Sequence, residues 1–129
     1  MATIERFQDI ICWQKARELE NVIYRLTSSE SFAKDYGLKD QINRATGSVM
    51  DDIAEGFGRG GNKEFANFLL ISRASAFEVQ SQIYRALDRN HISNEEFESI
   101  IKQSERVISV ITGFIVHLKN SERKGQRYE

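Results

Sequence analysis

The chain contains 129 residues, carries a formal net charge of −1 and has one cysteine, Cys12. This length predicts a single domain over residues 1–129 and excludes an enzyme with separate cofactor and substrate domains. A lone cysteine excludes an intrachain disulfide and a cysteine-based zinc site within one chain, so we expect a cytoplasmic protein. The near-neutral charge argues against a strongly basic nucleic-acid binder.

Helical periodicity dominates the whole sequence. There is no proline, where average usage would supply about six. In four segments apolar residues recur at alternating steps of three and four, which keeps them on one helix face. Short connections force neighbouring helices to run antiparallel. The sequence therefore predicts an all-α, antiparallel up-down-up-down four-helix bundle, with helices at about 9–28, 38–57, 63–89 and 94–119 and a charged C-terminal tail over 120–129.

Residues that favour helix starts lie near these boundaries. Ser93 and Glu96 form a capping box, because the serine oxygen can accept from the Glu96 amide while the Glu96 side chain reaches back to the Ser93 amide. Asp9 and Asn62 are suited to cap the first and third helices.

The sequence has more apolar residues than the inner faces of the four predicted helices need to form a core. A monomeric bundle needs about three sevenths of each helix inside, and the third and fourth helices exceed this share. The extra residues either wrap a well-packed core or form a second buried face, which would make the protein a homo-oligomer. They are Trp13, Phe68, Ile71, Phe77, Tyr84, Ile100, Val107, Val110 and Phe114.

A glycine motif and an acidic cluster are the features closest to known catalytic or binding patterns. Residues 56–61 match G-x-G-x-x-G, but a dinucleotide site needs a strand before the motif, and here a helix precedes it. We therefore expect helix termination and a tight turn. Asp51, Asp52 and Glu55 lie on adjacent turns without the Glu-x-x-His pairs typical of metal sites in bundles.

No catalytic, cofactor or metal site is predicted from the remaining residues. His91 falls in a predicted loop and His117 near the end of the last helix, so neither can complete a site with the acidic cluster. Cys12 lies on the inner stripe, where a buried structural thiol is expected.

Two neighbouring polar stripes predict a network between helices or subunits, with an ordinary solvated face as the alternative. In this network Arg44 would make a forked hydrogen bond to Glu55 or Glu78, because guanidinium matches carboxylate geometry. The predicted members are Gln41, Arg44, Ser48, Asp52, Glu55, Ser75 and Glu78.

Small groups of basic residues could contact phosphates through counterion release. Glu122 and Glu129 dilute the C-terminal group, and no RNA-reading aromatic motif occurs. The candidate nucleic-acid contacts are Arg59, Arg85, Arg89, Lys102, Arg106, Lys119, Arg123, Lys124 and Arg127.

Several of these segments together resemble a known family. The chain is similar to the four-helix-bundle proteins named after intervening sequences in 23S rRNA genes, over about residues 7–118. Asp52 and Ala74 depart from the family pattern, where asparagine and glycine are usual. The resemblance rests on Asp9-Ile-Ile-Cys-Trp-Gln-Lys-Ala16, Tyr36-Gly-Leu-Lys-Asp-Gln-Ile-Asn-Arg-Ala45, Ser48, Asp52-Ile-Ala-Glu-Gly-Phe-Gly-Arg59, Lys63-Glu-Phe65, Phe68-Leu69, Ser75 and Glu78.

This resemblance implies a bundle that assembles into a ring, commonly a pentamer, with no known catalytic activity. Relatives include accessory proteins of diversity-generating retroelements, which associate with reverse transcriptase and nucleic acid. We therefore expect a non-enzymatic homo-oligomer that presents a surface for RNA or a nucleoprotein. A protein-binding adaptor or scaffold with no nucleic-acid role is the alternative. We expect no cofactor, small-molecule substrate or membrane partner.

Overall fold

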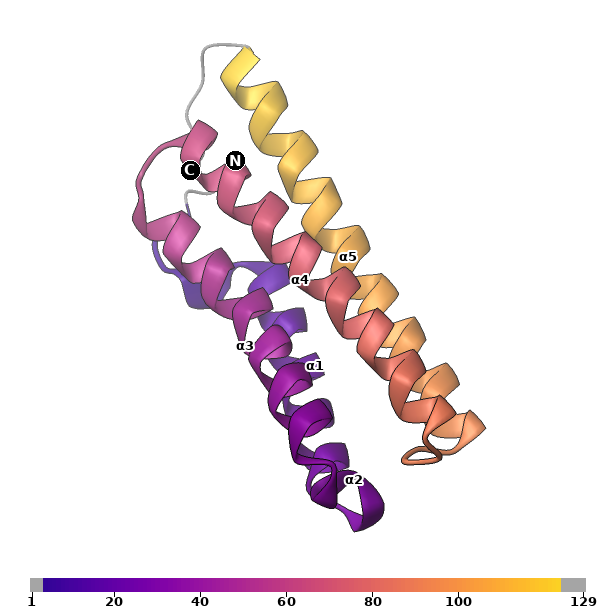
Figure 1. The fold of residues 1–129 in the computed structure, drawn as a ribbon. Helices are drawn as coiled ribbons and strands as arrows, with labels where there is room; N and C mark the ends of the chain where they lie inside the picture. Colours follow the sequence, from indigo (N-terminus) through magenta and orange to yellow (C-terminus); the bar gives the residue numbers. More distant parts are fainter. Residues whose placement is uncertain (1–3, 124–129) are drawn as a thin grey trace.

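The computed structural model describes residues 4–123, with side chains to residue 121. Four long helices pack side by side as an antiparallel up-down-up-down bundle (Figure 1). Each packs against its sequence neighbour, and α1 also packs against α5, which closes the bundle. This confirms the predicted all-α fold, and no strand occurs in residues 4–123. The elements are η1 (Phe7–Asp9), α1 (Ile11–Thr27), α2 (Glu30–Lys34), α3 (Tyr36–Gly58), α4 (Asn62–Asp88) and α5 (Asn94–Arg123).

The apolar stripes form the core, as their spacing predicts. Leu19, Ile53 and Leu69 are completely buried, and Ile111 lies beside them on α5. One buried polar contact joins two of the long helices, because the Ser72 hydroxyl on α4 donates to the Val49 carbonyl on α3 at 2.6 Å. Burial of apolar area drives this packing, at about 25 cal/mol per Å² removed from water.

The helix starts agree only partly with the predicted caps. The Glu96 side chain accepts from the Ser93 amide at 2.8 Å and the Glu96 amide donates to Ser93 Oγ at 3.1 Å, which confirms the capping box. Asp9 is not the cap of α1, because it lies inside η1 and Ile10 takes the cap position. Asn62 is likewise the first residue of α4, and Gly61 precedes it as the cap.

Two segments differ from the expected boundaries. The segment between the first two predicted helices, expected to be a loop, contains α2, whose Phe32 is buried. Five residues are too few to show helical periodicity, so neither α2 nor the burial of its Phe32 could be predicted from the sequence. The last helix continues to Arg123, past the expected end at residue 119. The rest of the predicted tail, residues 124–129, lies outside the described residues.

The glycine motif ends α3 and begins the turn to α4. A Cβ on Gly56 would lie 2.6 Å from Phe68 Cβ and 3.0 Å from Phe65 Cδ1, so the absent side chain lets α3 and α4 approach closely. Gly60 adopts a φ of +89°, which glycine tolerates at no steric cost. The motif therefore serves helix packing and termination, and the element that leads into it is the helix α3.

Candidate functional site

A line of exposed apolar side chains runs along the outer face of α4. Leu70, Phe77 and Tyr84 follow one another at seven-residue steps, with 36%, 54% and 54% of their surfaces exposed. The Tyr84 ring also meets the edge of Phe97 on α5, at 4.9 Å between centroids. These three residues, called the α4 stripe below, leave apolar side chains exposed along one face of the helix.

The extra apolar residues divide between the two roles that the sequence left open. Ile100 and Val107 belong to the core, so both wrap the interior. Ile71 is 52% exposed and joins Phe77 and Tyr84 on the surface. Trp13, Val110 and Phe114 are half-buried against the core, and Phe68 is half-buried as well.

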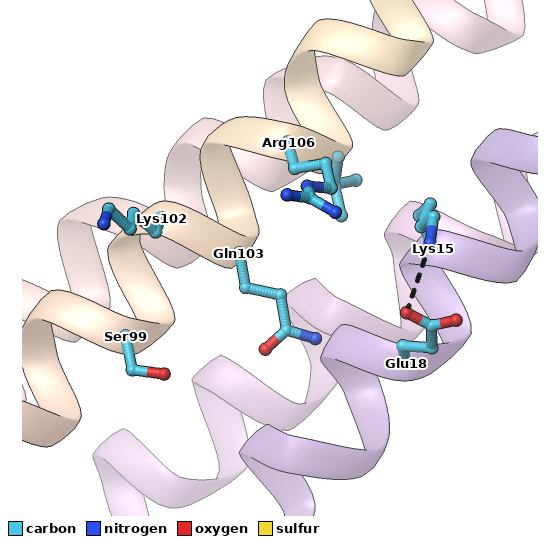
Figure 2. A pocket seen from close by; sticks show the side chains of 7 residues that line it. Lys15, Glu18, Ser99, Lys102, Gln103 and Arg106 are labelled. Carbon is cyan, nitrogen blue, oxygen red and sulfur yellow. Dashed lines mark ion pairs between the residues drawn. The ribbon is translucent and has the colours of Figure 1, made fainter.

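A groove of about 550 Å³ lies between α1 and α5. Figure 2 shows Lys15 and Glu18 on α1 across the groove from the α5 side chains. Lys15 Nζ lies 3.7 Å from Glu18 Oε1, on the same helix. The α5 side of this α1–α5 groove consists of Ser99, Lys102, Gln103, Arg106 and Val107.

The charges in the α1–α5 groove are not balanced. Lys102 and Arg106 lie four residues apart on α5, and neither forms an ion pair with any side chain up to residue 121. Like charges at this spacing destabilise a helix by about 0.2–0.5 kcal/mol. Three cations and one carboxylate leave the groove lining with a formal charge of +2. The groove therefore favours a negatively charged occupant.

Two predicted basic residues, Arg59 at the C-cap of α3 and Arg85 on α4, already have partners within the chain. Arg59 pairs with Glu55 at 3.0 Å and stacks over the Phe68 ring at 5.0 Å. Arg85 donates to Gln41 at 3.0 Å, a contact that joins α4 to α3. Contacts to a nucleic acid would have to compete with these partners.

The other candidate basic residues lie toward or beyond the end of α5. Lys119 is exposed near the end of α5, and Arg123 is its last residue. Lys124 and Arg127 lie outside the described residues.

The predicted polar network is only partly assembled within one chain. Arg44 pairs with Asp40 at 3.0 Å on its own helix, not with Glu55 or Glu78 as predicted. Arg44 and Asp40 are well exposed, and a partner four residues away on the same helix is the nearest carboxylate available to a solvated guanidinium. Within the described residues, the only hydrogen bond or ion pair that joins an expected member to another helix is that of Gln41 with Arg85.

The other predicted members of the polar network lie on α3 and α4 and are partly or fully exposed. Glu78 is exposed, whereas Ser48, Asp52 and Ser75 are half-buried. Burial raises the pKa of Asp52, and the neighbouring charges of Glu55 and Asp51 raise it further. A role for these residues between subunits stays a prediction.

A hydrogen-bonded cluster that sequence reasoning missed lies at one end of the bundle. His91 Nε2 lies 2.8 Å from Asp35 Oδ2, and His91 Nδ1 lies 2.8 Å from Ser31 Oγ. Arg89 also donates to Asp35 at 2.8 Å, and the Phe32 ring stacks on His91 at 5.1 Å. Hydrogen bonds from His91 and then from Arg89 lower the pKa of Asp35 to about 2.

This cluster, called the His91 clamp below, ties α2 and the start of α3 to the α4–α5 loop. A neutral imidazole with its proton on Nε2 satisfies both contacts, because Nε2–H donates to the carboxylate and Nδ1 accepts from the hydroxyl. Asp35 and His91 are 56 residues apart in the sequence. Since Asp35 falls in a predicted loop, no local pattern could have paired them.

Within the described residues, the remaining reactive side chains do not form a catalytic or metal-binding arrangement. Burial raises the pKa of the Cys12 thiol to about 12, so its thiolate is scarce at neutral pH. Residues 4–121 bring no three His, Cys, Asp or Glu side chains together as metal ligands. None of the helices described here has a stretch long and apolar enough to cross a membrane.

The sequence matches the model of the 23S rRNA-intervening sequence protein family over residues 8–113. The chain belongs to this family. A solved structure of a protein of unknown function from the S23 ribosomal protein family, from Bacteroides thetaiotaomicron VPI-5482, has a similar fold. It is 23% identical, covers 81% of this chain and 97% of its own, and superimposes with a TM-score of 0.73. No curated protein matches the chain.

The 23S rRNA-intervening sequence proteins are thus the family that the quoted motifs indicate. Neither the family description nor that of the similar structure names a catalytic activity. The site residues must therefore be interpreted from this chain's own geometry.

Proposed function

We propose that this protein is a non-enzymatic, self-assembling four-helix bundle whose ring-shaped homo-oligomer presents a surface for RNA or a nucleoprotein. The observation that carries the proposal is the exposed α4 stripe of Leu70, Phe77 and Tyr84. Covering such a stripe with another copy removes apolar area from water, at about 25 cal/mol per Å². A pentamer is the ring size that the family resemblance favours.

A closed ring needs two different patches on each protomer, since head-to-tail contacts join unlike surfaces. The α4 stripe supplies one patch. The second is the pair Tyr24 and Tyr36, which are 60% and 76% exposed on α1 and α3. They line a recess of about 380 Å³ at the α1–α3 seam, whose lining residues all come from α1 and α3.

The RNA part of the proposal is supported by the uncompensated cations of the α1–α5 groove. A ring repeats these groups once per protomer, so a chain with a net charge of −1 can still offer a periodic basic surface. The buried Cys12 thiol, whose pKa is raised by burial, is compatible with a reducing, cytoplasmic location, which is part of the proposal.

Oligomeric state tests the assembly. Sedimentation velocity of the wild-type protein should give a species several times the 14.9 kDa of one chain. Phe77→Glu places a charge in the α4 stripe and should give monomers with unchanged helical circular dichroism. Ile11→Glu is the matched control, because Ile11 is 56% exposed on another helix. A wild-type monomer, or a Phe77→Glu variant that still assembles, would refute the proposed interface.

A protein-binding adaptor is the second candidate, favoured by the near-neutral net charge. Salt distinguishes the two functions. Affinity for RNA should fall steeply as ionic strength rises, since each phosphate contact releases counterions, whereas a mostly apolar protein interface should change little.

A further inference from the structure

Three recesses follow one another along the seam between α1 and α5. Apolar side chains dominate the first and the last, which include Ile11 with Phe114 and Val22 with Leu26. The middle recess, the α1–α5 groove, is the basic one (Figure 2). Polarity therefore changes along a single seam, and the cations are confined to its centre.

We propose that the α1–α5 groove is a phosphate-binding site, in which Lys15 approaches the ligand from α1 and Lys102 and Arg106 approach it from α5. This inference deepens the proposed function and rests on it for RNA as the source of the phosphates. The same chemistry would also accept a free phosphorylated ligand, so the experiment includes both sources.

The first argument is the uncompensated charge on α5. Lys102 and Arg106 are exposed on successive turns without an anionic partner in the part of the chain with described side chains. Their Cα atoms are separated by about 6 Å along the helix axis, from a rise of 1.5 Å per residue. An anion lying between the two side chains would replace their repulsion with attraction to both.

The second argument is the number and kind of donors around the groove. Gln103 and Ser99 add neutral donors beside the cations, and Arg106 supplies the planar fork that suits phosphate oxygens. A phosphate has enough acceptor oxygens for donors from two helices at once, whereas a carboxylate has only two. Glu18 opposes an anion, but its charge is partly compensated by Lys15 at 3.7 Å.

The test uses the full chain and two probes, a short fluorescein-labelled single-stranded RNA of mixed sequence and inorganic pyrophosphate. RNA affinity is measured by fluorescence anisotropy over a range of salt concentrations. Pyrophosphate is followed by the NMR shifts of the Arg106 Nε–H and the Gln103 side-chain amide. The test variant is Lys102→Gln/Arg106→Gln. The control Lys34→Gln/Lys63→Gln removes the same charge from exposed residues on α2 and α4.

We expect the groove variant to bind RNA at least about tenfold more weakly than the control, with a salt slope reduced by about 0.7 for each lost phosphate contact. Pyrophosphate should shift both NMR signals in the wild type. If the groove variant binds RNA as the control does, the phosphate site is wrong while the proposed function survives.

Two further outcomes separate the sources. Pyrophosphate binding without RNA binding would support the site, with a free phosphorylated ligand as its occupant, and would overturn the RNA part of the proposed function. Polyglutamate that shifts the same signals with an affinity equal to that of RNA would overturn the phosphate assignment in favour of an acidic peptide.

Discussion

Asp35 Oδ2 and His91 Nε2 lie 2.8 Å apart, although the two residues are 56 positions apart in the sequence. Together with Arg89 they connect the start of α3 to the loop after α4. This end of the bundle is thus held by hydrogen bonds as well as by apolar packing.

The His91 clamp should make the folding stability fall as the pH is lowered into the acid range. The pKa of Asp35 is about 2 in the folded protein against an ordinary value of 3.8. A lowered carboxyl pKa contributes stability that is fully present above the unfolded value and is lost as pH falls through the folded one. We expect the wild type to lose this contribution between about pH 4 and pH 2.

Urea unfolding at pH 7 and pH 2.5 checks this expectation. At pH 7 the unfolding midpoint of Asp35→Asn should be lower than that of the wild type. At pH 2.5 the difference between the two midpoints should be smaller. A difference that does not shrink at low pH would show that ionised Asp35 contributes no stability.

Replacing Gly56 with alanine should lower the folding stability of the protein. An added Cβ would meet the Phe68 Cβ at 2.6 Å, so α3 and α4 would have to separate. Overpacking of this kind costs about 1–3 kcal/mol. Thermal or urea unfolding of Gly56→Ala measures the loss.

Gly113→Ala is the matched control, because nothing lies within 4 Å of its added Cβ and the residue is exposed within α5. Alanine is favoured over glycine there by about 0.5–1 kcal/mol, so this variant should be more stable. Equal effects of the two substitutions would contradict the close approach at Gly56.

Replacing Gln82 with methionine should stabilise the isolated bundle. Gln82 is 4% exposed, and its buried Oε1 has no hydrogen-bond partner among the residues that the structure describes. An unsatisfied buried polar group costs about 1–3 kcal/mol, and methionine has a similar shape without that group. Urea unfolding of Gln82→Met should therefore show a higher midpoint, and a lower one would reveal that the amide has a partner in solution.

The Cys12 thiol should react slowly in the folded protein. Burial raises its pKa to about 12 and removes it from solvent. Ellman's reagent at pH 8 should label native protein far more slowly than protein in urea, because the thiolate is the reactive form. Rapid labelling of the native protein would place the sulfur at the surface.

The sequence by itself determined the four long helices and the core. Helical periodicity is a local signal, so residues such as Leu19, Val49 and Ile111 identify their buried face without knowledge of their neighbours. The capping box of Ser93 and Glu96 was predictable for the same reason, since its two hydrogen bonds span three residues.

Only the tertiary structure decided which polar groups meet. The His91 clamp and the α1–α5 groove depend on rotations about helix axes and on loop paths that apolar spacing leaves free. Periodicity specifies which face of a helix is buried. Exposed ion pairs contribute little energy, so small differences in distance decide which charged side chains pair. The sequence thus determined the bundle, and the packing of α1 against α5 decided that Lys15, Lys102 and Arg106 line one groove.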